Sequence, residues 1–428
     1  MILPHAPLTS FVNKVKLVFN GPAMNKGLSR SRHMPGRSSS SADGTHAAMP
    51  LLELLREKDF RSLEDLRKGA KLGPREFEAA VGLLERKGML QRTNGRVAAH
   101  GRRPESLQIR AESGYVAAVD IGGTNLRVVI ADITGAIVGK WTASTVDASS
   151  PAKVVHLIEK GVKQIARQTG VQEGSLLAIA AGVAGVTDSK NGVVLLTSYL
   201  GGWKDVTLGK MLTDALGVPS VIENDVRLGA VGERWKGSAR GLDNFVFLAI
   251  GTGIAAGICV NGELLHGPAF AAGEVGYLVV PGTSEAGVRE GNPGSLEAAI
   301  GGEGIKSQWR QVTQRMHGEA MGDLNATDIF DRAQAGDEDA GRVLQNSAKI
   351  LAHAVYNISV VLNCSHFILG GGVGTNEILR DAAENVLRAY TEPAQPKLYL
   401  SSLGPEAQLI GAVRLALDAA ERRLGIRA

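Results

Sequence analysis

Apolar residues are spaced in two different ways along this chain. From 49 to 88 they recur at helical spacing, whereas after residue 114 short apolar runs alternate with longer segments of helical period. The later pattern predicts strands at 115–121, 126–133, 136–144, 176–183, 218–224, 244–250, 255–260 and 366–369. It predicts helices at 151–168, 205–216, 226–236, 341–363, 376–391 and 406–424. Alternation of this kind is typical of layered α/β folds.

The earlier part of the chain predicts three short helices followed by a hairpin. Ser62 is a suitable N-cap, and Pro74 suits the first turn of a helix over 74–87. The stretch "MLQRTNGRVAAHG" then alternates around an Asn-Gly pair, which favours a tight hairpin turn. This is the order of elements in a winged helix-turn-helix, whose 74–87 helix would lie in a DNA major groove.

Charge along the chain favours a polyanionic partner for this front part. Residues 1–110 hold 20 of the 47 Lys and Arg but only 10 of the 43 Asp and Glu. The candidate contacts to double-stranded DNA are Arg61, Arg75 and Arg86. The predicted helix over 74–87 also carries Glu76, Glu78 and Glu85, which phosphate would repel. Two alternatives therefore stay open. The front part is either a basic tail without a partner or a small domain that only packs or dimerises.

Composition and pattern together predict the domain organisation. We expect a disordered tail at 1–45, a winged helix-turn-helix at 46–100, a linker at 101–113 and an α/β body at 114–428. No run of about 18 apolar residues exists, so we expect no membrane span and a cytoplasmic protein. Cys259 and Cys364 lie in apolar runs without zinc-ligand spacing, which indicates buried thiols.

Three glycine-containing turns are the candidate phosphate sites. In "VDIGGTN" (119–125) and "AIGTGIA" (249–255), missing side chains would let backbone N–H groups approach an anion closely. The candidate contacts are Gly122, Gly123, Thr124, Asn125, Gly251, Thr252 and Gly253, with Gly371 and Gly372 of "HFILGGGVG" (366–374) placed under an adenosine. Asp120 would bind the Mg²⁺ that accompanies a nucleotide rather than the phosphates themselves. Alone, "DIGGT" could equally be a structural turn.

These motifs together resemble the ROK family (repressors, uncharacterised frames and kinases) of the sugar kinase, hexokinase and actin-like ATPase superfamily. The stretch "LAIGTGIAAGICVNGELLHGPAFAAGEVGYLVV" (248–280) carries the resemblance most clearly. The resemblance implies a two-lobed, ribonuclease H-like body, with lobe 1 at about 114–240 plus the C-terminal helix and lobe 2 at about 241–405. It also implies ATP and Mg²⁺ as cofactors, a hexose or N-acetylated aminosugar as substrate, and a homodimer or homotetramer.

The resemblance implies roles for residues at matching motif positions. "VIENDVRLGAVGE" (221–233) matches the family's Asn-Asp loop, so Asn224 would bind a sugar hydroxyl and Asp225 would be the general base for phosphoryl transfer. Gly185, Glu274 and Glu297 match other sugar-contacting positions. Read from the residues alone, Asn224-Asp225 could also simply cap the following helix.

The sequence departs from the family at its zinc site. The positions of the family's His and three Cys ligands hold Tyr277, Val288, Glu290 and Ser295, so we expect no structural zinc. Tyr277 also stands where the family's His contacts sugar, and Tyr199 replaces an Asn in "SYLGGW", which puts the identity of the sugar in question.

Two functions from different classes account for these features, and a third is weaker. The chain is either a sugar-responsive transcriptional regulator whose body binds ATP and sugar and phosphorylates the sugar, or a plain cytosolic sugar kinase with a front domain that does not bind DNA. A sugar-binding scaffold without catalysis rests only on Tyr277 and Tyr199. Retention of the glycine turns favours the first two, because a nucleotide would explain them.

Overall fold

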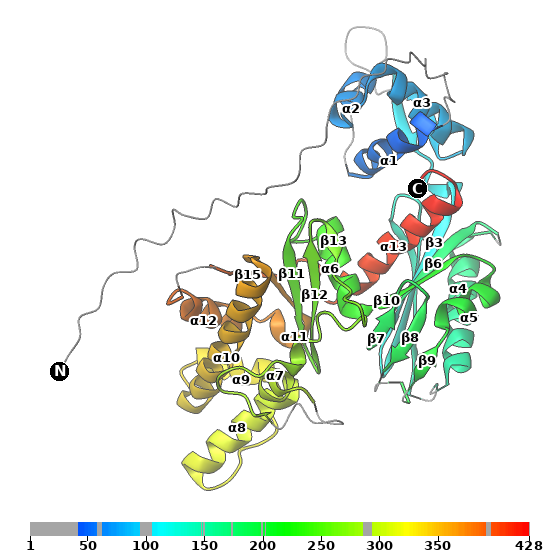
Figure 1. The fold of residues 1–428 in the computed structure, drawn as a ribbon. Helices are drawn as coiled ribbons and strands as arrows, with labels where there is room; N and C mark the ends of the chain where they lie inside the picture. Colours follow the sequence, from blue (N-terminus) through cyan, green and yellow to red (C-terminus); the bar gives the residue numbers. More distant parts are fainter. Residues whose placement is uncertain are drawn as a thin grey trace, which may run out of the picture. The chain divides into compact units, whose positions relative to one another are not determined.

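The computed structural model describes residues 42–57, 62–94, 105–146, 148, 150–172, 174–197, 200–201, 203–285, 293–390 and 395–427 (Figure 1). Residues 41–428 cluster as a single unit. Its elements are a helical head, two five-stranded sheets and one small three-stranded sheet.

The head contains three helices and two strands in the predicted order: α1 (Ala42–Glu57), α2 (Leu63–Gly69), α3 (Pro74–Arg86), β1 (Leu90–Asn94) and β2 (Glu105–Ile109). Ser62 caps α2 by accepting the Asp65 backbone N–H at 3.1 Å, as its sequence position predicts. One face of α3 is buried, and Phe77 and Leu84 lie on it. The apolar spacing of this segment therefore folds as expected.

Two expectations for the head are wrong. Helix α1 begins at Ala42 rather than near Met49, inside the segment assigned to the tail. The second strand is 105–109, inside the segment assigned to the linker, so β1 does not pair across a tight turn at Asn94. Leu107 and Ile109 are buried in the head, and their burial decides the pairing over the local preference of the Asn-Gly pair.

The first large sheet has the order β10-β6-β3-β4-β5. Its strands are β3 (Tyr115–Ile121), β4 (Asn125–Asp132), β5 (Ile137–Ser144), β6 (Leu176–Val183) and β10 (Ser220–Asn224), preceded by the short helix η1 (Ala111–Ser113). Strands β3, β4 and β5 are antiparallel neighbours, whereas β6 and β10 run parallel to β3. Helices α4 (Pro151–Thr169) and α5 (Leu208–Leu216) cover it, and we call this assembly lobe 1.

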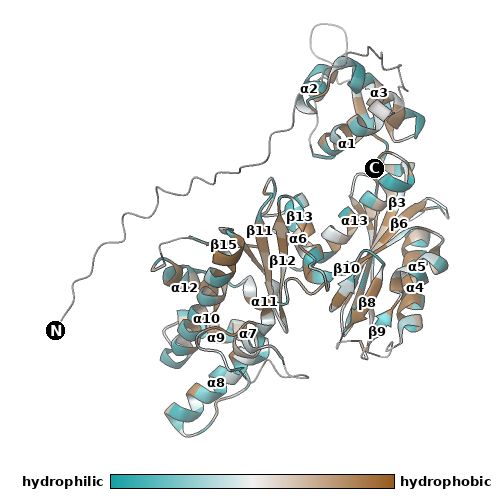
Figure 2. Cartoon of the chain, in the orientation of Figure 1, coloured by the Kyte–Doolittle hydropathy of each residue, from teal (hydrophilic) through white to brown (hydrophobic). Residues whose placement is uncertain are grey.

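The second large sheet repeats this order as β13-β12-β11-β14-β15. Its strands are β11 (Phe245–Ile250), β12 (Ile254–Val260), β13 (Glu263–Leu264), β14 (His366–Gly370) and β15 (Lys397–Leu400). Again the first three are antiparallel and the last two are parallel to the first. With its helices it forms lobe 2, and its strands, like those of lobe 1, are strongly hydrophobic (Figure 2).

Several elements were not predicted from the apolar pattern. They are the small sheet β7 (Val186–Asp188), β8 (Val193–Leu196) and β9 (Lys204–Val206), the strands β13 and β15, and the helices η2 (Val275–Tyr277), α7 (Ser295–Ile300), α8 (Gly302–His317), α9 (Ala326–Gln334), α11 (Gly371–Gly374) and η4 (Gly404–Glu406). The longer helices α10 (Glu338–Leu362) and α12 (Glu377–Leu387) lie where the pattern places them. Within the described ranges, no helix is long and apolar enough to cross a membrane.

The two lobes exchange the helices that follow their last strands. Helix α6 (Asp225–Lys236) follows β10 of lobe 1 but packs on β11 and β12 of lobe 2, whereas α13 (Ala407–Arg423) follows β15 and packs on β3 and β6. The two helices cross in backbone contact, because a Cβ at Gly411 would stand 1.9 Å from the Leu228 carbonyl oxygen. A Cβ at Gly232 would stand 2.2 Å from the Ala407 oxygen, so the crossing requires both glycines.

A buried ion cluster joins the head to α13. Arg56 of α1 pairs with Glu421 at 2.5 Å, and both side chains are almost fully buried. Arg56 also donates to the Ile133 carbonyl at 2.8 Å, and Arg414 pairs with Glu53 of α1 at 2.6 Å. Because charges removed from water must stay paired, these contacts hold α1 against the C-terminal helix.

Candidate functional site

Three polar positions meet at the carboxyl ends of parallel strands in lobe 1. Asp120 of β3 lies beside Gly182 of β6, and Gly182 lies beside Glu223 of β10. Asp225 then follows β10 directly and begins α6. Gly182 makes this arrangement possible, because a Cβ there would stand 2.6 Å from Leu228 and 3.5 Å from the Asp225 Cα. Ligands of open α/β sheets bind at such strand ends.

Asn224 is the N-cap of α6. Its side-chain oxygen accepts the Arg227 backbone N–H at 3.0 Å, and its amide donates to the Gly185 carbonyl at 3.1 Å. The capping role considered from the sequence is therefore real, and it brings Asn224 against Gly185. A second amide proton of Asn224 is left for another acceptor.

Asp225 is a carboxylate with an unusual environment. It makes no ion pair with any residue that the structure describes. Burial and the neighbouring charge of Asp120 raise its pKa to about 7, with a smaller contribution from Glu274. A general base works best when its pKa is close to the pH at which it operates.

Glu274 and Glu297 come together in lobe 2. Burial raises the pKa of Glu274, and the charge of Glu297 adds to this effect while Arg227 opposes it. Glu297, in the first turn of α7, accepts the Ile254 backbone N–H at 3.0 Å. Because Ile254 directly follows the Gly251–Gly253 turn, this bond ties a predicted sugar residue to a predicted phosphate turn.

The first glycine turn, between β3 and β4, presents free donors. The Gly122 N–H bonds to the Asn125 carbonyl at 2.9 Å, whereas the N–H groups of Gly123 and Thr124 have no partner in the part of the chain that is described. Asp120 receives two hydrogen bonds from Arg127, at 3.0 and 2.7 Å, on its Oδ2 atom. Its Oδ1 atom is left for a cation such as Mg²⁺, which needs only one or two protein carboxylates beside the phosphates.

The second glycine turn, between β11 and β12, is built in the same way. The Gly251 N–H bonds to the Gly253 carbonyl at 2.9 Å, and the N–H groups of Thr252 and Gly253 have no partner among the described residues. Gly372 lies next to this turn, 3.9 Å from where a Cβ of Gly251 would be. Gly371 adopts a φ of +79° under the Ile250 carbonyl, which only glycine tolerates easily. These free donors fit a phosphate chain.

A buried ion network next to Asp225 was not predicted from the sequence. Glu223 accepts Arg227 Nε at 2.7 Å on one oxygen and His266 Nε2 at 2.8 Å on the other. Although burial opposes it, the hydrogen bond from His266 and the charge of Arg227 hold the pKa of Glu223 below its usual value. Because Glu223 belongs to strand β10 and Arg227 to helix α6, the helical i, i+4 rule gives no signal for this pair.

The positions that correspond to zinc ligands in the ROK family are only partly described. Tyr277 is 53% exposed, and Ser295 is buried with its hydroxyl unpartnered. Val288 and Glu290 lie outside the described residues, as does Tyr199. Across the described ranges no group of three or more His, Cys, Asp and Glu could hold a metal. The absence of a structural zinc stays a prediction. Cys259 and Cys364 are buried free thiols, as expected.

In the head, all three carboxylates of α3 already have partners. Arg92 of β1 bonds Glu85 at 2.8 Å and lies 3.7 Å from Glu78, while Glu76 accepts the Gly73 N–H at 2.8 Å. The repulsion of phosphate expected from these glutamates is therefore reduced. The two predicted contacts Arg75 and Arg86 are exposed and make no ion pair with a described residue. Arg61 lies outside the described residues.

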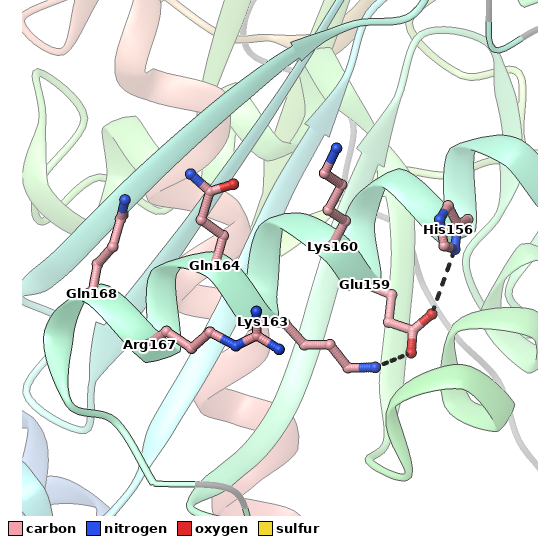
Figure 3. Close-up of a pocket in the computed structure, with 7 residues that line it drawn as sticks. All are labelled: His156, Glu159, Lys160, Lys163, Gln164, Arg167 and Gln168. Atoms are coloured by element: carbon pink, nitrogen blue, oxygen red, sulfur yellow. Dashed lines mark hydrogen bonds and ion pairs between the residues drawn. The ribbon is translucent and has the colours of Figure 1, made fainter.

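A surface hollow of about 490 Å³ lies along α4, away from all these residues (Figure 3). It is lined by His156, Glu159, Lys160, Lys163, Gln164, Arg167 and Gln168, which follow one face of a single helix. Glu159 pairs there with Lys163 at 2.5 Å. None of the residues predicted from the sequence lines it, and we interpret it as a solvated helix face.

The repeated strand order, the exchanged helices and the two glycine turns define a two-lobed α/β body of the actin-like ATPase class, preceded by a winged-helix head. The ROK family model matches residues 116–419, so the chain belongs to the ROK family.

Two relatives carry different names. A glucokinase of Halalkalibacterium halodurans is 28% identical over 304 residues, covering 68% of this chain and 92% of the relative. A xylose repressor of Caldicellulosiruptor bescii is 25% identical over 332 residues, covering 74% of this chain and 82% of the relative.

Two solved structures show the same fold. A ROK family transcriptional regulator, described as a homologue of the E. coli MLC protein, has a TM-score of 0.73 at 22% identity over 90% of this chain and 98% of its own. A ROK glucokinase of Streptomyces griseus, solved with glucose and AMPPNP, has a TM-score of 0.59 at 25% identity over 71% of this chain and 99% of its own. The regulator thus covers the head as well as the body.

Proposed function

We propose that this chain is a sugar-responsive transcriptional regulator whose body binds ATP and a hexose or N-acetylated aminosugar and phosphorylates the sugar. The observation that carries the proposal is Asp225, an unpaired carboxylate with a pKa of about 7 at the strand ends of lobe 1, in a chain that begins with a winged-helix head. The names of relatives, which include glucokinase, xylose repressor and N-acetylmannosamine kinase, support both halves of it.

Each predicted residue then has a role in phosphoryl transfer. Asp225 accepts the proton of the attacking sugar hydroxyl, and Asn224, Glu274 and Glu297 bind the remaining hydroxyls. Bound Mg·ATP would supply the γ-phosphoryl group to the sugar oxygen, with Mg·ADP as the leaving group. The N–H groups of the two glycine turns would hold phosphate oxygens, and the Asp120 carboxylate would hold the cation. These donors are fixed before the reaction, which lowers the cost of stabilising the developing charge.

The catalytic half is tested by ATP consumption of the full chain with glucose and N-acetylmannosamine, and with xylose as a pentose outside the proposed class. We expect turnover with glucose or N-acetylmannosamine and its loss in Asp225→Asn. No turnover with any of them, while ATP still binds, would contradict catalysis and leave a body that senses without reacting.

A plain sugar kinase with a front domain that does not bind DNA is the second candidate. The three carboxylates on α3 favour this second candidate, although all three already have partners within the head. The two candidates separate by selecting DNA duplexes from a randomised pool with the full chain. For a regulator, log K should fall with log salt, and Arg75→Ala or Arg86→Ala should reduce that slope by about 1. Absence of any retained duplex at low salt would favour the plain kinase.

A further inference from the structure

One guanidinium, that of Arg227, joins three separate segments of the body. Its Nη1 donates to the Phe270 carbonyl at 3.0 Å, its Nη2 donates to the Thr187 carbonyl at 3.1 Å, and its Nε donates to Glu223 at 2.7 Å. Thr187 belongs to β7 in the lobe 1 part of the chain, whereas Phe270 follows β13 of lobe 2. Arg227 is therefore bonded to both lobes at once.

Water has little access to these contacts, because the charges are buried. Arg227 is 2% exposed and Glu223 is 3% exposed. His266 closes the network from the lobe 2 side through its 2.8 Å bond to Glu223. Phe270 has a φ of +57°, which a bulky residue adopts only when its surroundings impose it, and Arg227 holds the carbonyl of that residue.

Each segment that Arg227 holds carries a predicted sugar contact. Gly185 lies two residues before Thr187, and Glu274 lies four residues after Phe270. Asn224 and Asp225 lie three and two residues before Arg227, at the start of the same helix. Because the three segments come from different parts of the chain, their mutual distances depend on tertiary bonds rather than on local structure.

We propose that Arg227 is a positioning residue that fixes the sugar site before sugar arrives, by holding these three segments at one guanidinium. Glu223 and His266 complete the arrangement, since they orient Arg227 and tie it to lobe 2. Arg227 touches neither sugar nor nucleotide. It acts by keeping the acceptors of sugar hydroxyls at fixed separations, so that less ordering is needed on binding. This inference deepens the proposed function and rests on it for the identity of the ligand.

The first test needs no ligand. Hydrogen–deuterium exchange of the full chain compares wild type with Arg227→Met and Arg227→Lys. We expect faster exchange in the Met variant at 184–188 and 266–276 only, because those segments lose their common anchor. Lys keeps the charge beside Glu223 but cannot bridge two carbonyls, so it should rescue only part of the protection. Unchanged exchange in these segments, or faster exchange everywhere, would overturn the proposal.

Arg234 offers a matched control two turns along the same helix. It also donates to backbone carbonyls, of Leu242 and Gly262, and pairs with Asp243, but none of its hydrogen bonds or ion pairs with described residues goes to lobe 1. Arg234→Met should therefore leave exchange at 184–188 and 266–276 as in wild type. The same increase in both variants would mean that losing any arginine of α6 loosens the body, and the proposal would be wrong.

The second test separates sugar from nucleotide. Isothermal titration with glucose, N-acetylmannosamine, xylose and AMPPNP should show at least a tenfold weaker affinity for the bound sugar in Arg227→Met, with AMPPNP affinity within about twofold of wild type. An equal loss for both ligands would contradict a positioning role. If wild type binds none of the three sugars, the proposed function fails for them, while the exchange experiment still decides whether Arg227 holds the segments.

Discussion

The starts of α6 and α13 occupy corresponding places in the two lobes, yet their carboxylates have opposite surroundings. Each helix comes after the last strand of its sheet and then packs on the other lobe. Asp225 begins α6 and has no ion pair within the described residues, whereas Glu406, just before α13, pairs with Lys140 at 2.8 Å and with Arg127 at 3.3 Å. A repeated fold thus leaves one carboxylate without an ion pair among the described residues and neutralises the other.

The pairing of Glu406 also has a consequence for lobe 1. Arg127, which bonds Glu406, is the residue that holds Asp120. The paired helix start therefore helps to orient a predicted cation ligand, while the unpaired one carries the predicted base. The two helix starts therefore have different predicted roles, a chemical one for Asp225 and a structural one for Glu406. Substituting each carboxylate in turn tests this difference.

Replacing Asp225 by Asn should produce the largest effect. Turnover of ATP with sugar should fall about 10²- to 10⁴-fold, because a positioned general base contributes a factor of that size. Wild-type turnover should rise as the pH increases through about 7, the pKa of Asp225, since only the ionised carboxylate accepts a proton. Glu406→Gln is the comparison at the corresponding helix start. Because Glu406 acts on Asp120 only through Arg127, turnover should fall far less in this variant, and a comparable loss would remove the distinction.

Replacing Gly411 by Val should destabilise the crossing that exchanges the two helices. A Cβ there would stand 1.9 Å from the Leu228 carbonyl oxygen, so the free energy of unfolding should drop by about 3 kcal/mol or more. Urea denaturation followed by circular dichroism measures this. Gly341→Val is the matched control in α10, where a Cβ meets nothing within 4 Å. Equal stability of the two variants would show that α6 and α13 can move apart at their crossing without loss of stability.

Asp225→Asn should also stabilise the ligand-free chain at neutral pH. Because the folded-state pKa is raised from 3.8 to about 7, the folded chain binds this proton more tightly than the unfolded chain. The stability that comes from the protonated group is full below pH 3.8 and is lost as the pH rises through about 7. The gain from Asn should therefore grow by about 2 to 4 kcal/mol between pH 4 and pH 8. A gain independent of pH would contradict the raised pKa.

Glu406→Gln should have the smallest effect, a loss of about 0.5 kcal/mol in the free energy of unfolding. The Glu406 side chain is 36% exposed and that of Lys140 is 58% exposed, so solvent screens the pair. Urea denaturation at low and high salt measures the change, which should vanish at high salt. A loss above about 2 kcal/mol would mean that Glu406 is as tightly constrained as a buried ion, and the contrast with Asp225 would need another explanation.

The sequence predicted the central strands of the body well because they are fully buried. Strands β3 and β6 have the predicted bounds, since their apolar runs end abruptly at polar or glycine residues. Helices α7, α8 and α9 were not predicted because their apolar faces are short and interrupted by glycine and charged residues. The pairing of β1 with 105–109 also escaped prediction, because burial of Leu107 in the head outweighs the local signal of the Asn-Gly pair.

The residues of the candidate site also fall into those that were predicted from the sequence and those that were not. The resemblance to the ROK family predicted Asn224 and Asp225 together, and both lie at the strand ends of lobe 1. The contacts of Glu223 with His266, 43 positions apart, and of Arg227 with Thr187, 40 positions apart, depend on the assembled lobes. No local pattern could give partners that become neighbours only after two sheets have formed.

The ion cluster between α1 and α13 determines which motions could carry a signal to DNA. Arg56 binds both the Ile133 carbonyl beside β4 and Glu421 of α13, so the head is attached to lobe 1 at two points. In the frame of reference of lobe 1, the head would therefore keep its place in any movement of lobe 2 that the bonds of Arg227 allow. A sugar-dependent change in the spacing of two heads would then require that the paired subunits touch through lobe 2.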